Sequence, residues 1–125
     1  MDIEELYNLL RTERKTRSIQ PFPENEIKQY LSELKTLQRE LLADERMWKE
    51  RRRVEDELET AEFCVREIIR LRAIKVTHHA IFTSLVCDVS DSPLVLKNMT
   101  EEEGEIFWRL CEGLKKIYEK VMREL

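Results

Sequence analysis

The sequence predicts an all-α protein, a bundle of four to five helices that includes one long helix. Charged residues make up 38% of the 125-residue chain, and it contains only two glycines and three prolines, a composition that favours long helices over turns. Apolar residues also recur at intervals of three and four, as on the buried face of a helix. A chain of this length buries about 65% of its unfolded surface, enough for the core of a single domain over residues 1–125.

The first two helices are expected on either side of a proline-containing connection. Asp2 is a favourable N-cap residue and Glu5 follows three residues later, so we predict a first helix over residues 2–17. The Pro-Phe-Pro sequence at residues 21–23 predicts an extended connection, because each proline disfavours helical backbone in the residue before it. We expect its phenylalanine to fill a pocket. A second helix is predicted over residues 24–44, with an apolar face of Ile27, Tyr30, Leu31, Leu34, Leu37, Leu41 and Leu42.

A long third helix is predicted over residues 47–86, which contain no proline or glycine; if continuous, it is about 60 Å long. Its start at residues 48–59 is so highly charged that we expect it to project from the core or to join the bundle only at its edge. A loop is expected over residues 87–99, and Thr100 with Glu103 predicts a capping box that starts the last helix. The core face of that helix is predicted to be Phe107, Leu110, Leu114, Ile117 and Val121.

One face of the third helix changes from apolar to basic partway along. Spacings of three and four residues place apolar side chains on this face first, and two bases and a histidine after them. Charges on a packed face are costly unless acids or polar groups of a partner compensate them. We therefore expect this helix to pack against a specific partner, within the chain or on another chain. The residues of this face are Val54, Leu58, Ala61, Val65, Ile68, Arg72, Lys75 and His79.

The residue types that most enzymes need are poorly placed for catalysis. The only glycines, Gly104 and Gly113, lie inside the predicted last helix, so no glycine-rich loop can bind a phosphate. His78 and His79 are neighbours on a helix and diverge by about 100°, which prevents them from binding one metal together. Cys64 lies among apolar residues, as a core thiol does. The sequence therefore predicts no catalytic, metal-binding or cofactor-binding residue and no enzymatic activity.

The cysteines and the hydropathy pattern bear on the environment of the protein. Cys64, Cys87 and Cys111 are odd in number and far apart, without a CxxC pair or a secretory leader, so we expect a reducing compartment and helix-packing thiols. The longest uncharged run, residues 76–87, is too short to span a bilayer. We expect a soluble protein that does not enter a membrane.

The charge distribution gives little support to nucleic-acid binding. The formal net charge is −4, with 26 acids against 22 bases, so any such binding must be local. Aromatic residues for base stacking are not interleaved with the basic runs, so solvated helix faces or interface charges are the preferred interpretation. A small helical nucleic-acid-binding regulator is the alternative function. The basic runs are Arg11, Arg14, Lys15 and Arg17; Lys49, Arg51, Arg52 and Arg53; and Arg66, Arg70, Arg72 and Lys75.

The two tryptophans are candidate interface residues. Trp108 follows Phe107 on a helix, so the two side chains point to different faces, and one can fill the core while the other meets a partner. Trp48 lies beside the charged KERRR run, where core and interface roles both stay open. The predicted interface or buried-charge residues are Arg72, Lys75, Trp48, Trp108, Arg66 and Arg70.

Three sequence elements carry a resemblance to a known family. They are ELxxA at residues 57–61, LRxxK at residues 71–75, and the helix start NMTEE at residues 98–102. With these elements the chain resembles the helical domain of a GINS subunit, part of the four-subunit replication factor that joins the MCM helicase. The resemblance extends from about residue 54 to residue 121. The first 46 residues agree in pattern, with a short helix, a proline-containing turn and a second helix.

The resemblance also implies a domain order. The chain starts with helices, as in the archaeal-type GINS branch in which the helical domain precedes a small C-terminal β-domain. Because the sequence ends at Leu125, immediately after the last helix, we expect that β-domain to be absent. Localisation follows the source: the nucleoid region of the cytoplasm in an archaeal cell, or the nucleus in a eukaryote.

The function that the resemblance implies is that of a non-catalytic scaffold. Such a subunit assembles with itself or with a sister GINS subunit into a tetramer and helps to activate the MCM helicase at initiation and during fork progression. A RecJ-like replisome factor and a DNA polymerase or primase are further implied partners, with weak or no direct nucleic-acid binding. On this basis Arg72 and Lys75 are expected to form buried or half-buried pairs with acids of neighbouring helices.

Overall fold

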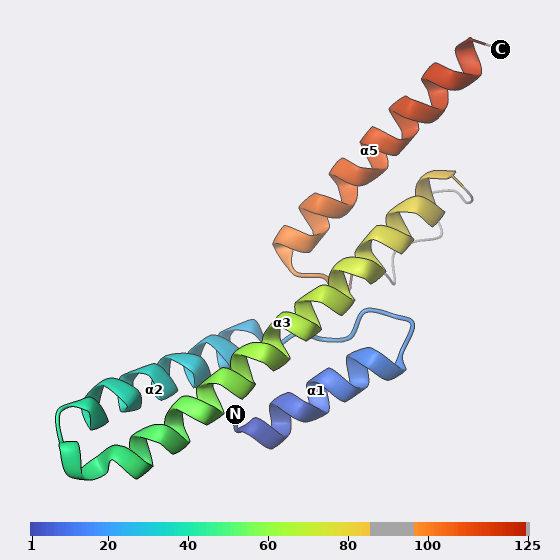
Figure 1. Ribbon diagram of the computed structural model, residues 1–125. Helices are drawn as coiled ribbons and strands as arrows, with labels where there is room; N and C mark the ends of the chain where they lie inside the picture. The colour runs from blue at the N-terminus through green and yellow to red at the C-terminus, as the bar shows by residue number, and fades with distance from the viewer. Residues whose placement is uncertain (86–96, 125) are drawn as a thin grey trace. The chain divides into compact units, whose positions relative to one another are not determined.

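The computed structural model describes residues 1–85 and 97–124, and every regular element in these ranges is a helix (Figure 1). The predicted all-α fold with one long helix is confirmed, because the third helix continues for 38 residues. The predicted loop over residues 87–99 lies mostly outside the described residues. The elements are α1 (Ile3–Lys15), α2 (Glu24–Leu42), the short 3₁₀ helix η1 (Glu45–Met47), α3 (Trp48–Leu85) and α5 (Glu101–Arg123).

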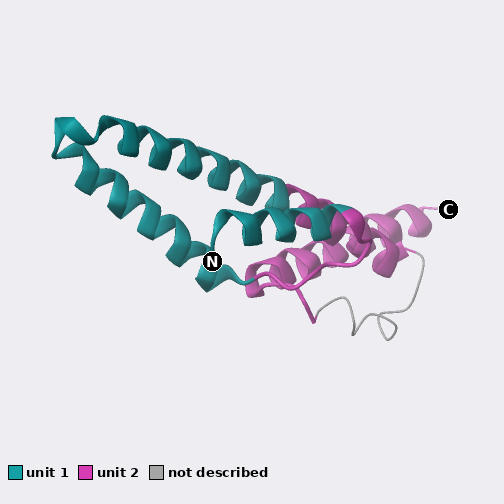
Figure 2. Cartoon of the chain, turned by 90° about the horizontal axis from the view of Figure 1, so that it is seen from below, with its two compact units in different colours: residues 1–14, 23–69 teal, residues 15–22, 70–125 magenta. Residues whose placement is uncertain are grey.

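The chain divides into two compact units, which Figure 2 shows in different colours. Unit 1 comprises residues 1–14 and 23–69, and unit 2 comprises residues 15–22 and 70–125. α3 contributes to both, so each unit contains part of this one continuous helix. That residues 1–125 form a single domain stays a prediction.

The core of unit 1 is built by α1, α2 and the first part of α3. Asp2 caps α1 as predicted, because its Oδ1 accepts a hydrogen bond of 2.9 Å from the backbone N–H of Glu5. An ion pair of 3.8 Å between Arg14 and Glu67 joins α1 to α3. The buried apolar residues are Leu6, Leu10, Ile27, Tyr30, Leu34, Val54, Leu58, Ala61, Cys64 and Ile68.

The charged start of α3 packs more closely than predicted. Val54 and Leu58 are only 7% and 8% exposed, so the expectation that residues 48–59 project or join only at the edge is wrong from Val54 onward. The charges do not prevent this packing because they fall on other faces of the helix and pair along it. Arg51 and Glu55, for example, are four residues apart and lie 3.6 Å from each other.

The connection between α2 and α3 is a short capped turn. α2 ends at Leu42, two residues earlier than predicted, because Asp44 acts as the N-cap of η1. Its carboxylate accepts a hydrogen bond of 3.0 Å from the backbone N–H of Arg46. The predicted apolar face of α2 is not buried along its whole length, since Leu37 is 42% exposed and Leu42 is 54% exposed.

The core of unit 2 joins the second part of α3 to the first half of α5. The buried cluster comprises Ile19, Val76, Ala80, Phe107 and Cys111, with Met99 and Leu110 packed against it. Phe107 is fully buried and the neighbouring Trp108 is 44% exposed, so the two rings face different surroundings, as predicted. The predicted core face of α5 is wrong in its second half, because Ile117 and Val121 are 64% and 55% exposed.

Two of the three cysteines lie in the described residues, and both are buried free thiols that pack between helices. Burial raises the pKa of the Cys64 thiol, which keeps it protonated. Cys111 donates a weak hydrogen bond of 3.8 Å to the backbone carbonyl of Ala80. Cys87 lies outside the described residues. No helix in the described part of the chain is long and apolar enough to cross a membrane.

We predict that Gly113→Ala stabilises the protein by about 0.5–1 kcal/mol. Gly113 lies inside α5, and a Cβ atom built on it meets no atom within 4 Å. The alanine therefore removes conformational freedom from the unfolded chain without a steric cost in the helix. Urea unfolding followed by circular dichroism measures the change. A lower free energy of unfolding in the variant would contradict this account of α5.

Candidate functional site

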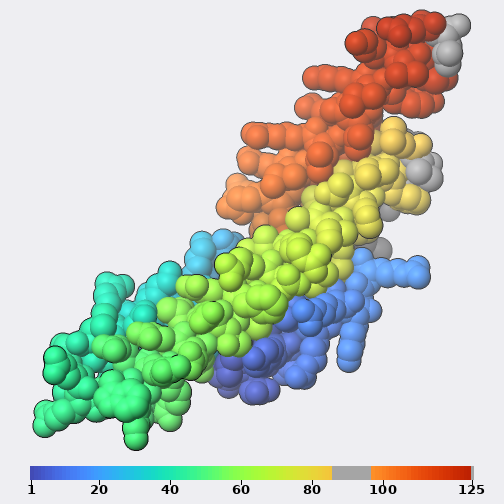
Figure 3. Space-filling view, viewed as in Figure 1, coloured from blue at the N-terminus to red at the C-terminus, as the bar shows by residue number. Residues whose placement is uncertain are grey.

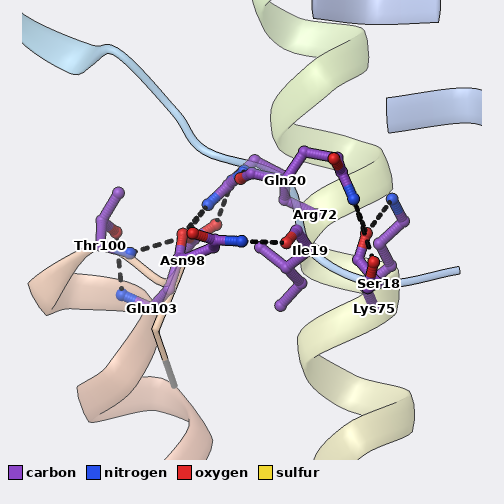
Figure 4. Close-up of polar contacts among 8 residues, drawn as sticks. All are labelled: Ser18, Ile19, Gln20, Arg72, Lys75, Asn98, Thr100 and Glu103. Carbon is purple, nitrogen blue, oxygen red and sulfur yellow. Dashed lines mark hydrogen bonds and ion pairs between the residues drawn. The ribbon is translucent and has the colours of Figure 1, made fainter. Parts of the chain in front are cut away.

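The largest fully buried side chain of the described residues is a charged one, Arg72 on α3, with 1% of its surface exposed. Its guanidinium donates two hydrogen bonds to the Glu103 carboxylate, from Nε to Oε2 at 2.9 Å and from Nη2 to Oε1 at 2.8 Å (Figure 4). Nη2 also donates to the backbone carbonyl of Asn98 at 2.7 Å, and Nη1 donates to that of Gln20. The planar guanidinium can donate to all of these acceptors at once because its N–H groups point in several directions, whereas the single ammonium nitrogen of a lysine cannot reach them all.

The contacts of Arg72 bring together three segments that are distant in sequence. Arg72 lies on α3, Gln20 belongs to the connection after α1, and Asn98 and Glu103 both belong to the start of α5. Asn98 lies two residues before the capping residue Thr100, and Glu103 lies in the first turn of the helix. Asn98 adds a direct link between two of these segments, because its Nδ2 donates a hydrogen bond of 3.0 Å to the carbonyl of Ile19. We call this group the Arg72 junction; it consists of Ile19, Gln20, Arg72, Asn98 and Glu103.

Glu103 serves the junction and the start of α5 at the same time. The Thr100 hydroxyl accepts a hydrogen bond of 3.2 Å from the backbone N–H of Glu103. The Glu103 carboxylate accepts one of 2.9 Å from the backbone N–H of Thr100, which completes the predicted capping box. The side chain that binds Arg72 is therefore held in place by the helix start itself.

The electrostatics of the junction favour charged Glu103. Burial by itself raises the pKa of this carboxyl, but the hydrogen bonds from Arg72 and Thr100 and the charge of Arg72 outweigh it, so the pKa is lowered overall. The Phe22 ring centroid lies 5.0 Å from Cζ of Arg72, which gives the guanidinium an aromatic face as well. Phe22 is half-buried, between the two prolines of the connection.

Comparison with known proteins identifies the family. The family model of the GINS complex protein helical bundle domain (Sld5) matches residues 1–122. The chain belongs to the GINS family. The predicted resemblance is thereby confirmed, and the family places this chain in a DNA replication complex built from GINS subunits. Searches of curated proteins and of solved structures gave no significant match.

Two of the sequence elements that resembled GINS subunits meet in the junction. Arg72 and Lys75 are the bases of the LRxxK element, and Asn98 and Thr100 belong to the helix start NMTEE. Lys75 is half-buried, and its Nζ donates to the carbonyl of Ser18 at 3.0 Å and to the Thr16 hydroxyl at 3.4 Å. In this GINS chain the two elements therefore hold the connection after α1 and the start of α5 on α3.

The other predicted site residues of this GINS chain do not join the junction. Arg66 and Arg70 lie on α3 with exposed side chains, and Trp48 is 52% exposed at the start of the same helix. Trp108 is 44% exposed, with its ring centroid 5.3 Å from that of Phe107 in an edge-to-face arrangement. Their role at an interface stays a prediction.

Sequence reasoning identified Glu103 only as a capping residue and missed its ion pair with Arg72. The hydrogen bonds of Arg72 to the Asn98 and Gln20 carbonyls were also missed. They join residues 26 and 52 positions apart, and helical periodicity gives no information on contacts at such separations. The acid that Arg72 needs is supplied by its own chain.

Among the described residues, no group of three histidines, cysteines, aspartates or glutamates could hold a metal ion.

We predict that Arg72→Ala lowers the free energy of unfolding by about 3–5 kcal/mol, because it leaves the Glu103 charge and two carbonyls without their donor. Glu103→Gln weakens the same contacts, so adding it to Arg72→Ala costs less than the sum of the single changes. Urea unfolding of the four proteins measures both effects. Arg66→Ala, at an exposed position of the same helix, is the control and changes stability by less than about 0.5 kcal/mol. Full additivity would show that Arg72 and Glu103 are not coupled.

We also predict that acid weakens the junction. Since the folded-state pKa of Glu103 is lowered, its contribution to stability is complete above its unfolded value of about 4.3 and is lost as the pH falls through the lower folded value. The difference in free energy of unfolding between the natural chain and Glu103→Gln should therefore shrink as the pH falls below the pKa of the carboxyl in the unfolded chain. Urea unfolding at a series of pH values measures it, and a difference that stays constant would exclude the ion pair as its source.

Proposed function

We propose that this GINS chain is a non-catalytic scaffold subunit that assembles into a tetramer with a sister GINS subunit or with copies of itself. The observation that carries the proposal is an exposed apolar surface on the second half of α5. We call it the α5 surface; it consists of Leu114, Ile117, Tyr118, Val121 and Met122.

The α5 surface continues the buried face of its own helix. Ile117 and Val121 follow Phe107 at spacings that keep them on one side of α5, yet they are 64% and 55% exposed. Tyr118 and Met122, next to them, are 53% and 48% exposed. Charged residues of both signs flank the surface, as at the rim of a protein interface. An apolar helix face that extends beyond its own core is suited to pack against a helix of another subunit.

The role that follows is one of binding, without chemistry on a substrate. A rigid assembly of helical subunits would hold the MCM helicase in a fixed geometry and help to activate it, as expected for the GINS branch with its helical domain first. A RecJ-like factor and a DNA polymerase or primase are the further proposed partners. Membership of the GINS family supports this role.

No specific observation favours the alternative of a nucleic-acid-binding regulator. Several bases of the predicted runs pair with acids within the chain: Arg14 with Glu67 and Arg51 with Glu55. Arg72 is buried and bound to Glu103. These bases are less available to phosphates than the sequence alone suggested.

We predict that Ile117→Ser combined with Val121→Ser weakens subunit assembly by about tenfold or more, because both side chains lose apolar contact area at the centre of the surface. Size exclusion with light scattering, on the chain alone and mixed with a sister GINS subunit, measures the assembly. The matched control is Lys115→Ser with Glu119→Ser, an exposed pair with the same spacing on the opposite face of α5. Unchanged assembly of the apolar variant would exclude the α5 surface, and a monomer in both natural samples would contradict the proposed function.

A further inference from the structure

A second exposed apolar group lies in unit 1, where α2 turns into α3. We call residues 42–53 the hairpin tip; they comprise the end of α2, η1 and the start of α3. Leu42, Met47 and Trp48 are 54%, 38% and 52% exposed there. In Figure 3 this part of the chain, coloured teal to green, is open to solvent on the face shown. Exposed tryptophan and methionine side chains are typical anchors of protein interfaces.

The hairpin tip is basic although the whole chain is acidic. It contains five bases against three acids, whereas the formal net charge of the chain is −4. Some of these bases already have acidic partners: Arg46 lies 3.3 Å from Asp44, and Arg53 pairs with Glu50. Lys49 and Arg52 have no acidic partner within the described part of the chain. The tip therefore presents positive charge that its own acids do not neutralise.

The two bases without acidic partners lie beside the exposed indole. Nζ of Lys49 is 5.5 Å from the ring centroid of Trp48. Arg52 follows Trp48 by four residues on α3, so both side chains lie on the same face of the helix. An apolar anchor and two cationic groups are thus available to one bound molecule.

The turn that carries these groups is fixed before any partner binds. The Asp44 carboxylate caps η1 through the backbone N–H of Arg46, and the Met47 N–H donates a hydrogen bond of 3.0 Å to the Asp44 carbonyl. Binding to a surface with an ordered backbone loses less conformational entropy than binding to a mobile loop. The tip is therefore suited to specific docking.

We propose that the hairpin tip docks an acidic peptide segment that carries an apolar side chain. Carboxylates of the segment pair with Lys49 and Arg52, and its apolar side chain packs on Trp48 and Met47. A polynucleotide fits less well, because three acids interrupt the basic residues of the tip, and Trp48 is the one aromatic residue among residues 42–53, whereas binding along a strand uses several stacking rings. The α5 surface lies in unit 2, so this inference stands or falls independently of the proposed subunit assembly.

The test uses the full chain and a fluorescein-labelled peptide in which glutamates flank a Leu-Phe pair. We expect the peptide to bind, with an affinity that falls as salt rises. Trp48→Ala and the double variant Lys49→Glu with Arg52→Glu should each weaken binding by about tenfold or more, measured by fluorescence anisotropy. The matched control is Phe63→Ala with Lys35→Glu, an exposed aromatic residue and an exposed base elsewhere in unit 1, which should leave affinity within about twofold.

A second readout reports contact with the indole itself. The chain has two tryptophans, so Trp108→Phe leaves Trp48 as the only one, and peptide binding should shift its emission to shorter wavelength. Equal binding of the peptide by tip and control variants would overturn the proposal. So would equal binding of a peptide with serine in place of the Leu-Phe pair. Tighter binding of a single-stranded oligonucleotide, lost in the same tip variants, would assign the tip to nucleic acid instead.

Discussion

An arginine with 1% of its surface exposed needs all of its charge compensated inside the protein, and this requirement organises unit 2. Arg72 receives a carboxylate, two backbone carbonyls and an aromatic ring. No single neighbouring element supplies these groups. The connection after α1 and the start of α5 must both lie against α3 before the guanidinium is satisfied, so the burial of one side chain is linked to the position of both segments.

The double use of Glu103 makes this arrangement cooperative. Its carboxylate closes the capping box of α5 with Thr100 and also binds Arg72. Loss of the helix start would release the acid from the arginine, and loss of the arginine would remove a constraint on the helix start. This coupling gives a physical reason why the LRxxK element and the NMTEE helix start lie together in this chain. The first supplies the guanidinium donors. The second supplies the Asn98 carbonyl and, through Thr100, caps the helix turn that holds Glu103 in place.

The exposed surfaces of the two units differ in chemistry. The α5 surface is an apolar helix face with charges of both signs at its edges, suited to a second helix of similar character. The hairpin tip combines an indole with unneutralised bases on a capped turn, suited to an acidic and more extended segment. Two surfaces of different chemistry on one chain are suited to partners of different chemistry.

The sequence by itself determined the α-helices of the described residues, the caps at Asp2 and Thr100, and the face on which each α-helix is apolar. It did not predict η1 or its Asp44 cap. Local signals suffice for the predicted features, because the capping box at Thr100 and the stripe through Val54, Leu58 and Ala61 depend on residues within a few turns of one another. The sequence also showed that Arg72 lies on a packed face and therefore needs a partner. Only the tertiary structure decided that the partner is Glu103 of the same chain, because a contact between residues 31 positions apart depends on how the chain folds back. It also decided where the apolar face of α5 leaves the core, since Ile117 continues the spacing of Phe107 but is 64% exposed, whereas Phe107 is fully buried.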